Sequence, residues 1–398
     1  MRREAMLETS WAVIQDYPHP SPKNKDAARL GHPSSSIPRS QKRNLGHPRF
    51  LLPLLLLLVS LPSTAQEIRF GVLGLFHPRE LILQPEGPQV LSVAAQGGAG
   101  NPALVLNGEP GHRQIVFRAE GDRVVAGSSS AGSWSAAARD GGTVAFRLIV
   151  PGKFHRVYHG RLAIQARKGE LLVVVAMDRE TAVSSIVAAE MAENAPMEAL
   201  KAQAVATRSF LAAGARHKDF DFCDTTHCQF LKSPPPLTSR VSSAVEATRG
   251  LVLAYRGKPL AALYSSRCGG QTRSLRDVGL QGASTTPGDA YPYYSVRCQW
   301  CLRHPATWQS RIGASGEPPQ PGNERRRIAG VRQWGWGAIP GSDFTAIAEG
   351  SGWRLEGHSM GHGVGMCQLG ATGMAAAGAG FRQILSHYYP NTELITLP

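Results

Sequence analysis

The stretch from Ser184 to Gln229 reads SSIVAAEMAENAPMEALKAQAVATRSFLAAGARHKDFDFCDTTHCQ. Its first half is apolar and rich in alanine, and Glu190 is the first carboxylate in it. Its second half ends in a dense group of cysteines and histidines. The two halves predict a pair of packed helices followed by a compact loop that carries metal-binding residue types.

The apolar half predicts two helices. In residues 180–190 the apolar side chains recur at i, i+3 and i+4, and Glu190 continues the same face at i+7. Pro196 suits the first position of a second helix, where its missing N–H is not needed. Small side chains allow this second helix to pack closely, and they are Ala199, Ala202, Ala204 and Ala206. We therefore expect Glu190 on a helical surface that faces the protein body.

The remaining sequence indicates an α+β fold. Only 18% of the residues are charged, and the 43 glycines and 28 prolines favour a loop-rich body over a helical bundle. Residues 66–150 contain short apolar runs separated by Gly, Pro and Asp-Gly turns, which is typical of strands. We expect this part to be a β-rich accessory region. Residues 151–398 are expected to form a second domain in which the helical pair packs against strands.

The charge of the chain suits an anionic partner. The net charge is +14, and the chain stays basic without residues 1–65. The sequence has no nucleic-acid-binding motif such as an aromatic RNA-binding strand or zinc-finger spacing. A polyanionic bacterial envelope is therefore favoured over nucleic acid as the partner.

Residues 1–65 predict an N-terminal extension with a secretory signal. The apolar run Phe50–Leu61 follows several basic residues and precedes small residues that end at Ala65. Twelve residues are too few for a membrane-spanning helix, which needs about 20. We expect export to the periplasm or cell envelope, with cleavage after Ala65. Contact with the membrane is expected only if this segment stays uncleaved.

Glu190 is the candidate catalytic residue. A carboxylate that is withdrawn from water has a raised pKa, and the protonated acid can donate to the leaving oxygen of a glycosidic bond. Glycosidases usually need a second carboxylate, and none stands out nearby. A lone acid suits an enzyme in which one residue acts first as acid and then as base. The alternative is an exposed glutamate at a helix end.

A group of four residues predicts a zinc site. Zinc favours tetrahedral coordination by nitrogen and sulfur, and four protein ligands make a structural site with no open position. A disulfide between Cys223 and Cys228 is the alternative, and a zinc hydrolase that uses this group is a further one. The candidate ligands are His217, Cys223, His227 and Cys228.

Two further groups in the C-terminal half leave more than one interpretation. His358 and His362 are four residues apart, but the surrounding glycines argue against a helix, so we expect a loop with His362 in the wall of a substrate groove. The other group comprises four cysteines, which could form disulfides, stay free or bind one metal ion. We favour disulfides and leave their pairing open. These cysteines are Cys268, Cys298, Cys301 and Cys367.

Several of these motifs resemble the signatures of the SpoIID/LytB family of cell-wall proteins. The first is VAAEMAENAPMEALKAQAVATRSF, Val187 to Phe210, and the second is GHGVGMCQLGA, Gly361 to Ala371. Tyr264–Thr272 and Gly378–Pro390 also fit that family. The resemblance implies a lytic transglycosylase that cleaves the MurNAc–GlcNAc bond of peptidoglycan, in some members on strands without stem peptides. It makes Glu190 the acid and base, while the sugar's own 6-hydroxyl closes a 1,6-anhydro ring.

The resemblance also implies further site residues. Lys201 and Arg208 would face the groove, where a basic residue can hold the lactyl carboxylate of MurNAc. His362 and Gln368 of the second signature complete the expected substrate contacts. The family's structural zinc site would fall on the Cys/His group named above. Some members are described as amidase enhancers, so the alternative is a non-catalytic wall-binding protein that stimulates a cell-wall amidase.

One departure from the family pattern concerns cysteine. Cys268 and Cys367 stand where many members have serine or another small residue. Their joint presence implies that the two are linked.

Overall fold

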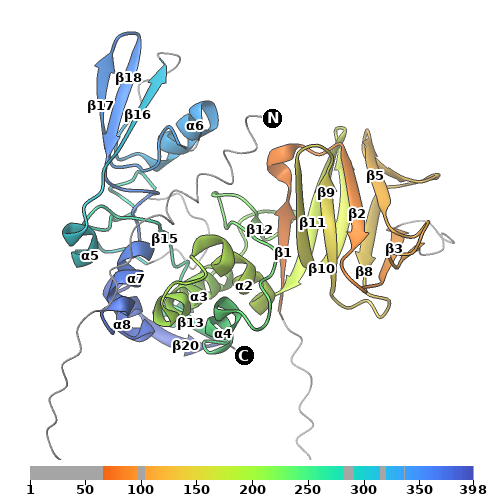
Figure 1. The fold of residues 1–398 in the computed structure, drawn as a ribbon, viewed down its shortest axis with the longest axis horizontal. Coiled ribbons are helices and arrows are strands. Elements are labelled where there is room, and N and C mark those ends of the chain that lie inside the picture. Colours follow the sequence, from red (N-terminus) through yellow and green to blue (C-terminus); the bar gives the residue numbers. More distant parts are fainter. Residues whose placement is uncertain (1–65, 97–103, 281–290, 314–319, 336, 398) are drawn as a thin grey trace, which may run out of the picture.

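The computed structural model describes residues 66–96, 104–280, 291–313, 320–335 and 337–397 (Figure 1). The expected secretory signal and its cleavage point lie outside these residues. Within the described ranges, no helix is both long enough and apolar enough to cross a membrane. The predicted α+β class is confirmed, with a large sheet followed by helices that pack against strands.

Twelve strands form the large sheet, in the order β12-β1-β11-β10-β9-β2-β5-β6-β7, with β8, β3 and β4 attached beside β10. Short apolar runs with frequent turns produce these strands, as the sequence predicts. Their bounds are β1 (Glu67–Val72), β2 (Glu80–Pro85), β3 (Leu91–Gln96), β4 (Leu104–Leu106), β5 (Ile115–Glu120), β6 (Arg123–Ala126), β7 (Ser129–Ala131), β8 (Ser133–Ala137), β9 (Val144–Val150), β10 (Phe154–Arg167), β11 (Glu170–Asp178) and β12 (Phe222–Cys223).

The 14-residue strand β10 joins the two parts of this sheet. Its first half pairs with β9, and its second half pairs with β11 on one side and β8 on the other. A Cβ atom at Gly160, between these halves, would lie 2.3 Å from the Ala176 carbonyl oxygen, so a glycine is needed there. The sheet also continues across residue 150, where we expected a domain division, because β9 and β10 form an antiparallel hairpin there.

The predicted helical pair follows β11. Asp178 caps α2 (Arg179–Glu190) by accepting hydrogen bonds from the backbone N–H groups of Glu180 and Thr181. After a short turn comes α3 (Met197–Ala212). The alanines of α3 named above are fully buried, which confirms the close packing expected for this helix.

Helix α3 lies between two hydrophobic cores. Leu200 and Phe210 pack in the core beneath the large sheet, whereas Val205 and Ala206 pack in the core of the C-terminal part. The elements of that part, other than the unit described next, are α4 (Arg240–Glu246), β13 (Leu251–Tyr255), β14 (Lys258–Pro259), β15 (Tyr264–Ser265), α5 (Gln299–Arg303), β19 (Met366–Cys367), α7 (Gln368–Ala376), α8 (Phe381–Tyr388) and β20 (Glu393–Thr396).

A small unit projects at the upper left of Figure 1, away from the large sheet. It is a three-stranded antiparallel sheet, β16-β18-β17, with one helix and a small core of its own. Its elements are β16 (Trp308–Gly313), α6 (Glu324–Trp334), β17 (Phe344–Glu349) and β18 (Gly352–Gly357).

Candidate functional site

Glu190 is the last residue of α2, and it meets the first residue of α7. The side-chain amide of Gln368 donates to the Glu190 carboxylate oxygen Oε2 at 3.3 Å and to its backbone carbonyl at 3.2 Å. The two residues are 178 positions apart in the chain. The first and second sequence signatures therefore meet at Glu190, which is partly exposed while Gln368 is buried.

The pKa of Glu190 is raised to about 7, because the surrounding protein withdraws its carboxyl group from water. The hydrogen bond from Gln368 and the positive charge of Lys232 lower this pKa but do not cancel the effect of burial. The position at the C-terminal end of a helix also disfavours negative charge. Glu190 can therefore hold a proton near neutral pH and still release it, as a general acid and base must.

A network of buried polar side chains extends from Gln368. Its amide also lies 3.3 Å from the Gln203 side-chain oxygen, and Gln203 donates to the Thr207 hydroxyl at 3.2 Å. Gln203 and Thr207 are one turn apart on α3 and fully buried. The Tyr264 hydroxyl donates to Gln229, and the negative charge of Glu190 helps raise the pKa of that tyrosine.

These neighbours of Glu190 were missed in the sequence analysis. Two polar residues four positions apart on an alanine-rich helix, Gln203 and Thr207, were a usable signal. Lys232 is exposed, and it is the cation whose charge acts on Glu190. Nothing in its local sequence marks it.

His362 lies in a loop, as the glycines predict. Gly361, Gly363 and Gly365 all have positive φ angles, of 85°, 74° and 73°, which a helix does not allow. The Nδ1 atom of His362 accepts a hydrogen bond from the Val364 N–H at 3.0 Å. Burial lowers the pKa of His362, and its ring is hydrogen-bonded to the backbone of Tyr264. A neutral His362 is therefore connected, through the backbone of Tyr264, to the network around Glu190.

Arg208 does not face a groove, in contrast to the expectation from the family signature. Its side chain has no solvent exposure and forms a bidentate ion pair with Glu180 of α2, at 2.8 and 2.6 Å. It also donates to the carbonyl of Leu251 at 3.0 Å. A fully buried guanidinium needs all of these partners to offset its lost hydration. Arg208 thus joins α2, α3 and β13 and is not available to a ligand.

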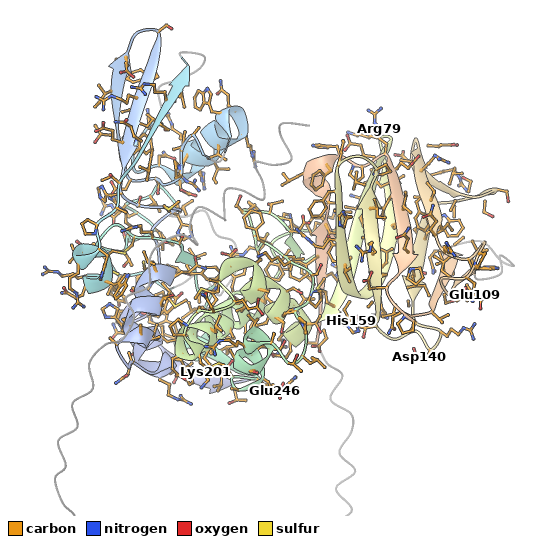
Figure 2. All side chains as sticks on the ribbon, viewed as in Figure 1. Arg79, Glu109, Asp140, His159, Lys201 and Glu246 are labelled. Carbon is orange, nitrogen blue, oxygen red and sulfur yellow. The ribbon has the colours of Figure 1, made fainter. Side chains whose placement is uncertain are left out.

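Lys201 also forms an ion pair within the protein. Its ammonium lies 2.7 Å from Glu198, one turn earlier on α3. Figure 2 shows Lys201 at the lower edge of the helical part. Of the four expected substrate contacts, the structure brings Gln368 to Glu190 and links His362 to Tyr264. Lys201 and Arg208 instead form ion pairs with Glu198 and Glu180.

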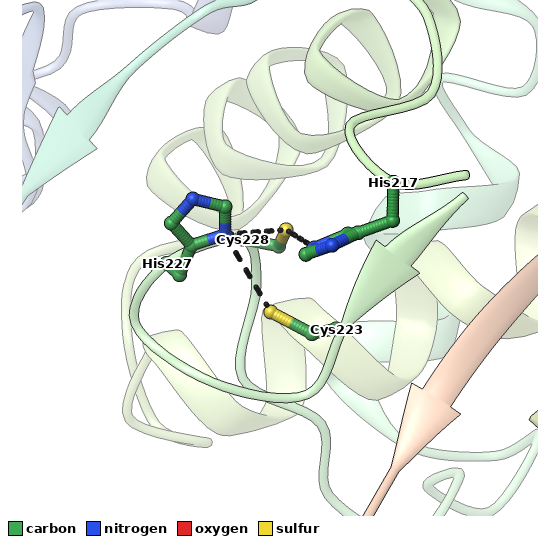
Figure 3. A group of neighbouring side chains, drawn as sticks. All are labelled: His217, Cys223, His227 and Cys228. Carbon is green, nitrogen blue, oxygen red and sulfur yellow. Dashed lines mark hydrogen bonds between the residues drawn. The ribbon is translucent and has the colours of Figure 1, made fainter. Parts of the chain in front are cut away.

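The predicted zinc ligands converge on one point (Figure 3). His217, Cys223, His227 and Cys228 offer ligand atoms that all lie within 4.8 Å of one another. The His217 Nε2 atom is 3.2 Å from the Cys228 sulfur, and the His227 Nδ1 atom is 3.5 Å from the same sulfur. Tetrahedral zinc with its usual bond lengths places nitrogen and sulfur about 3.5 Å apart. These four residues, here called the His/Cys cluster, can hold one zinc ion.

The His/Cys cluster is held between the sheet and α3. Strand β12 carries Cys223 and pairs with β1, and the Cys228 side chain packs in the core beneath the large sheet. The Cys223 pKa is lowered, chiefly by hydrogen bonding to Cys228. Both cysteines are free thiols in the structure, which favours the metal site over a disulfide between them.

The other four cysteines form a second group. Cys268, Cys298, Cys301 and Cys367 are all buried, and their sulfurs lie within 4.8 Å of one another. The structure thus brings Cys268 and Cys367 together, but all four carry free thiols, in contrast to the disulfides that we favoured. These four residues are here called the four-cysteine cluster.

Comparisons with known proteins agree with the residues at the site. Residues 167–255 match the model of the SpoIID family, described as stage II sporulation protein. An uncharacterized protein of Brachyspira hyodysenteriae is 29% identical over 278 residues, 60% of this chain and 72% of that protein. Stage II sporulation protein D of Bacillus subtilis is 27% identical over 260 residues, 54% of this chain and 74% of that protein.

The amidase enhancer of Bacillus subtilis is also similar, with 24% identity over 286 residues, 53% of this chain and 40% of that protein. The family match contains Glu190 and the whole His/Cys cluster. Residues 167–255 therefore carry the SpoIID family region, and the chain is a distant homologue of stage II sporulation protein D and of the amidase enhancer.

Proposed function

We propose that this protein is an exported lytic transglycosylase of peptidoglycan. The SpoIID family acts on the cell wall, and such a substrate lies outside the cytoplasm. The proposal of a lytic transglycosylase rests on Glu190, a partly exposed carboxyl group with a pKa of about 7 at the point where the two sequence signatures meet. The basic charge of the chain suits an anionic glycan.

The proposed reaction needs one carboxyl group. Protonated Glu190 donates to the glycosidic oxygen between MurNAc and GlcNAc, and the C1–O bond breaks. The resulting carboxylate accepts the proton of the 6-hydroxyl of MurNAc, whose oxygen bonds to C1 and closes the 1,6-anhydro ring. The proton count balances, no water enters the product, and Glu190 ends protonated as it began.

Other residues around Glu190 receive supporting roles. Gln368 orients the carboxyl group of Glu190 through its hydrogen bond, and His362 contributes to the wall of the substrate groove beside Tyr264. Exposed Lys232 takes the role that we expected of Lys201 and Arg208, because its charge acts on Glu190 and can pair with the lactyl carboxylate of the sugar. Replacing Lys232 with glutamine should raise KM more than it lowers kcat.

The test is digestion of purified glycan strands, with and without stem peptides, followed by mass spectrometry of the products. Wild-type protein should release fragments that end in 1,6-anhydro-MurNAc. Glu190→Gln should lose at least about 100-fold of this activity, since general acid–base catalysis contributes about 10²–10⁴-fold. Glu193→Gln is the matched control, because Glu193 is exposed in the next turn. Equal activity of wild type and Glu190→Gln would exclude the mechanism.

A second candidate function is stimulation of a cell-wall amidase. The similarity to the amidase enhancer favours it, although it covers 40% of that protein. In this case the protein would bind the wall, release no fragments and accelerate an added amidase. Glu190→Gln would leave both the binding and the acceleration unchanged.

We also propose structural zinc at the His/Cys cluster. The four residues supply a complete tetrahedral set, so zinc there would hold the loop between α3 and α4 and would not bind substrate. Removal of the ion should then unfold this part of the protein. Loss of turnover with an intact fold would instead indicate a catalytic ion.

A further inference from the structure

The four-cysteine cluster is assembled from three separate segments. Cys268 follows β15, Cys298 and Cys301 lie at the start of α5, and Cys367 ends β19 and caps α7. Strands β15 and β19 pair directly, with Ser265 opposite Cys367. The backbone N–H of Cys298 donates to the carbonyl of Gly270 at 2.8 Å. Backbone hydrogen bonds therefore fix the positions from which the four sulfurs converge.

The geometry of the four sulfurs fits one tetrahedral ion. All lie within 4.8 Å of one another, and the sulfurs of Cys301 and Cys367 are 3.6 Å apart. With zinc–sulfur bonds of about 2.3 Å, a tetrahedral site places its sulfurs about 3.8 Å apart. A disulfide would instead bring two sulfurs to about 2.05 Å. An iron–sulfur cluster would need room for inorganic sulfide among the four thiolates.

We propose that Cys268, Cys298, Cys301 and Cys367 bind one structural zinc ion, in addition to the ion proposed at the His/Cys cluster. Each of the four side chains is at most 2% exposed. A site with four thiolates and no access for water has no open position for substrate, so the role of the ion is structural. The zinc assignment is independent of the proposed transglycosylase activity.

The surroundings of the sulfurs support bound thiolates. The Gly370 N–H donates to the Cys367 sulfur at 3.3 Å, and the Tyr388 hydroxyl lies 3.4 Å from the Cys298 sulfur. Hydrogen bonds of this kind stabilise metal ligands and fix their orientation. A Cβ atom at Gly370 would lie 2.6 Å from the Cys298 sulfur and 2.0 Å from the Tyr388 oxygen. The glycine is thus needed for α7 to approach the sulfurs.

The ion would also act on the candidate active site. Cys367 directly precedes Gln368, which contacts Glu190, and α5 packs on α7 with Trp300 against Gly373. Zinc would thereby fix the start of α7 and hold the Gln368 amide against the Glu190 carboxyl group. This coupling makes Cys367 a positioning residue, and it is the part of the inference that rests on the proposed function.

The test is the zinc content of the protein, purified after export without chelator or reductant. Elemental analysis should give two zinc ions per chain for the wild type. The double variant Cys298→Ser/Cys301→Ser should keep one, and the matched variant Cys223→Ser/Cys228→Ser should keep the other. One zinc ion in the wild type that is lost entirely from the second variant would overturn the proposal.

If the Cys298→Ser/Cys301→Ser protein fails to fold, a second measurement on the other variant tests the proposal. In the folded Cys223→Ser/Cys228→Ser variant, cobalt should replace the remaining zinc one for one and give the visible and near-ultraviolet bands of tetrahedral cobalt bound by thiolates. Mass spectrometry of wild-type protein unfolded without reductant should show all six cysteines as thiols. A mass lower by two hydrogens for each pair of these cysteines would show disulfides in the four-cysteine cluster and would overturn the assignment. Iron in place of zinc in the elemental analysis would also overturn it.

Discussion

The two clusters of metal-ligand residues differ in how the chain builds them. The His/Cys cluster comes from one loop of twelve residues, and its members range from exposed to buried. The four-cysteine cluster comes from three segments spread from Cys268 to Cys367, and all its members are buried. A metal ion in the first would therefore fix a local loop, whereas an ion in the second would join distant parts of the C-terminal region. The four predictions below test this difference.

The largest expected difference concerns stability. Cys301→Ser should lower the free energy of unfolding by more than about 4 kcal/mol, because structural zinc contributes about 10–16 kcal/mol in finger peptides and no water can replace a buried ligand. Cys223→Ser should cost about half as much, since water can reach that partly exposed position. Chemical denaturation of both variants measures the two values. A greater loss for Cys223→Ser would reverse the comparison.

The two ions should also differ in the rate at which a chelator removes them. Zinc should leave the His/Cys cluster first, and its release from the four-cysteine cluster should be at least about 100-fold slower. The buried site has to open first, and such openings cost a few kcal/mol. Stopped-flow and manual mixing with a colorimetric chelator resolve the two phases. A single fast phase of two ions would show that the four-cysteine cluster is as accessible as the first.

The pH dependence of activity separates both clusters from the chemistry. Glu190 has a pKa raised to about 7, so its acid form is present below pH 7 and is lost above it. The value of kcat/KM should therefore fall about tenfold per pH unit above pH 7. Replacing zinc by cobalt should leave this limb in place. If the basic limb of the pH profile shifted when cobalt replaced zinc, a metal-bound water at the His/Cys cluster would be indicated instead.

The smallest expected effect concerns the link from the four-cysteine cluster to Glu190. Gln368→Leu removes a hydrogen bond that lowers the pKa of Glu190, so the basic limb should move upward by less than about 1 pH unit. The pH profile of kcat/KM measures the shift. Gln309→Leu, on distant β16, is the control and should not move it. A limb that stays in place in Gln368→Leu would show that the start of α7 does not act on Glu190.

Local patterns predicted the parts of the site that are contiguous in sequence. The helical face of Glu190 and the ligands of the His/Cys cluster each lie within a few helical turns or one loop. Their periodicity and spacing are therefore visible in the sequence. The same holds for the glycine loop at His362, where positive φ angles need glycine.

Features that depend on distant partners could not be predicted in this way. Arg208 was expected to face the substrate groove, but its partner Glu180 lies 28 positions away on another helix. The sequence left the four cysteines open between disulfides, free thiols and one metal site, because their convergence needs the pairing of β15 with β19, which no local pattern encodes. The unit of β16–β18 and α6 was also missed, because its short strands lie among irregular and glycine-rich segments.

The position of helix α3 determines whether the protein can be divided into fragments that fold. Twelve of its sixteen residues are buried, and the apolar ones among them are divided between two cores. A fragment that ends after α3 would expose Val205 and Ala206, which pack in the core of the C-terminal part. A fragment that begins after α3 would lack these two side chains in that core. Neither half should fold alone. The large sheet and the C-terminal part should therefore unfold in one cooperative transition, although α3 makes up only a small part of the chain.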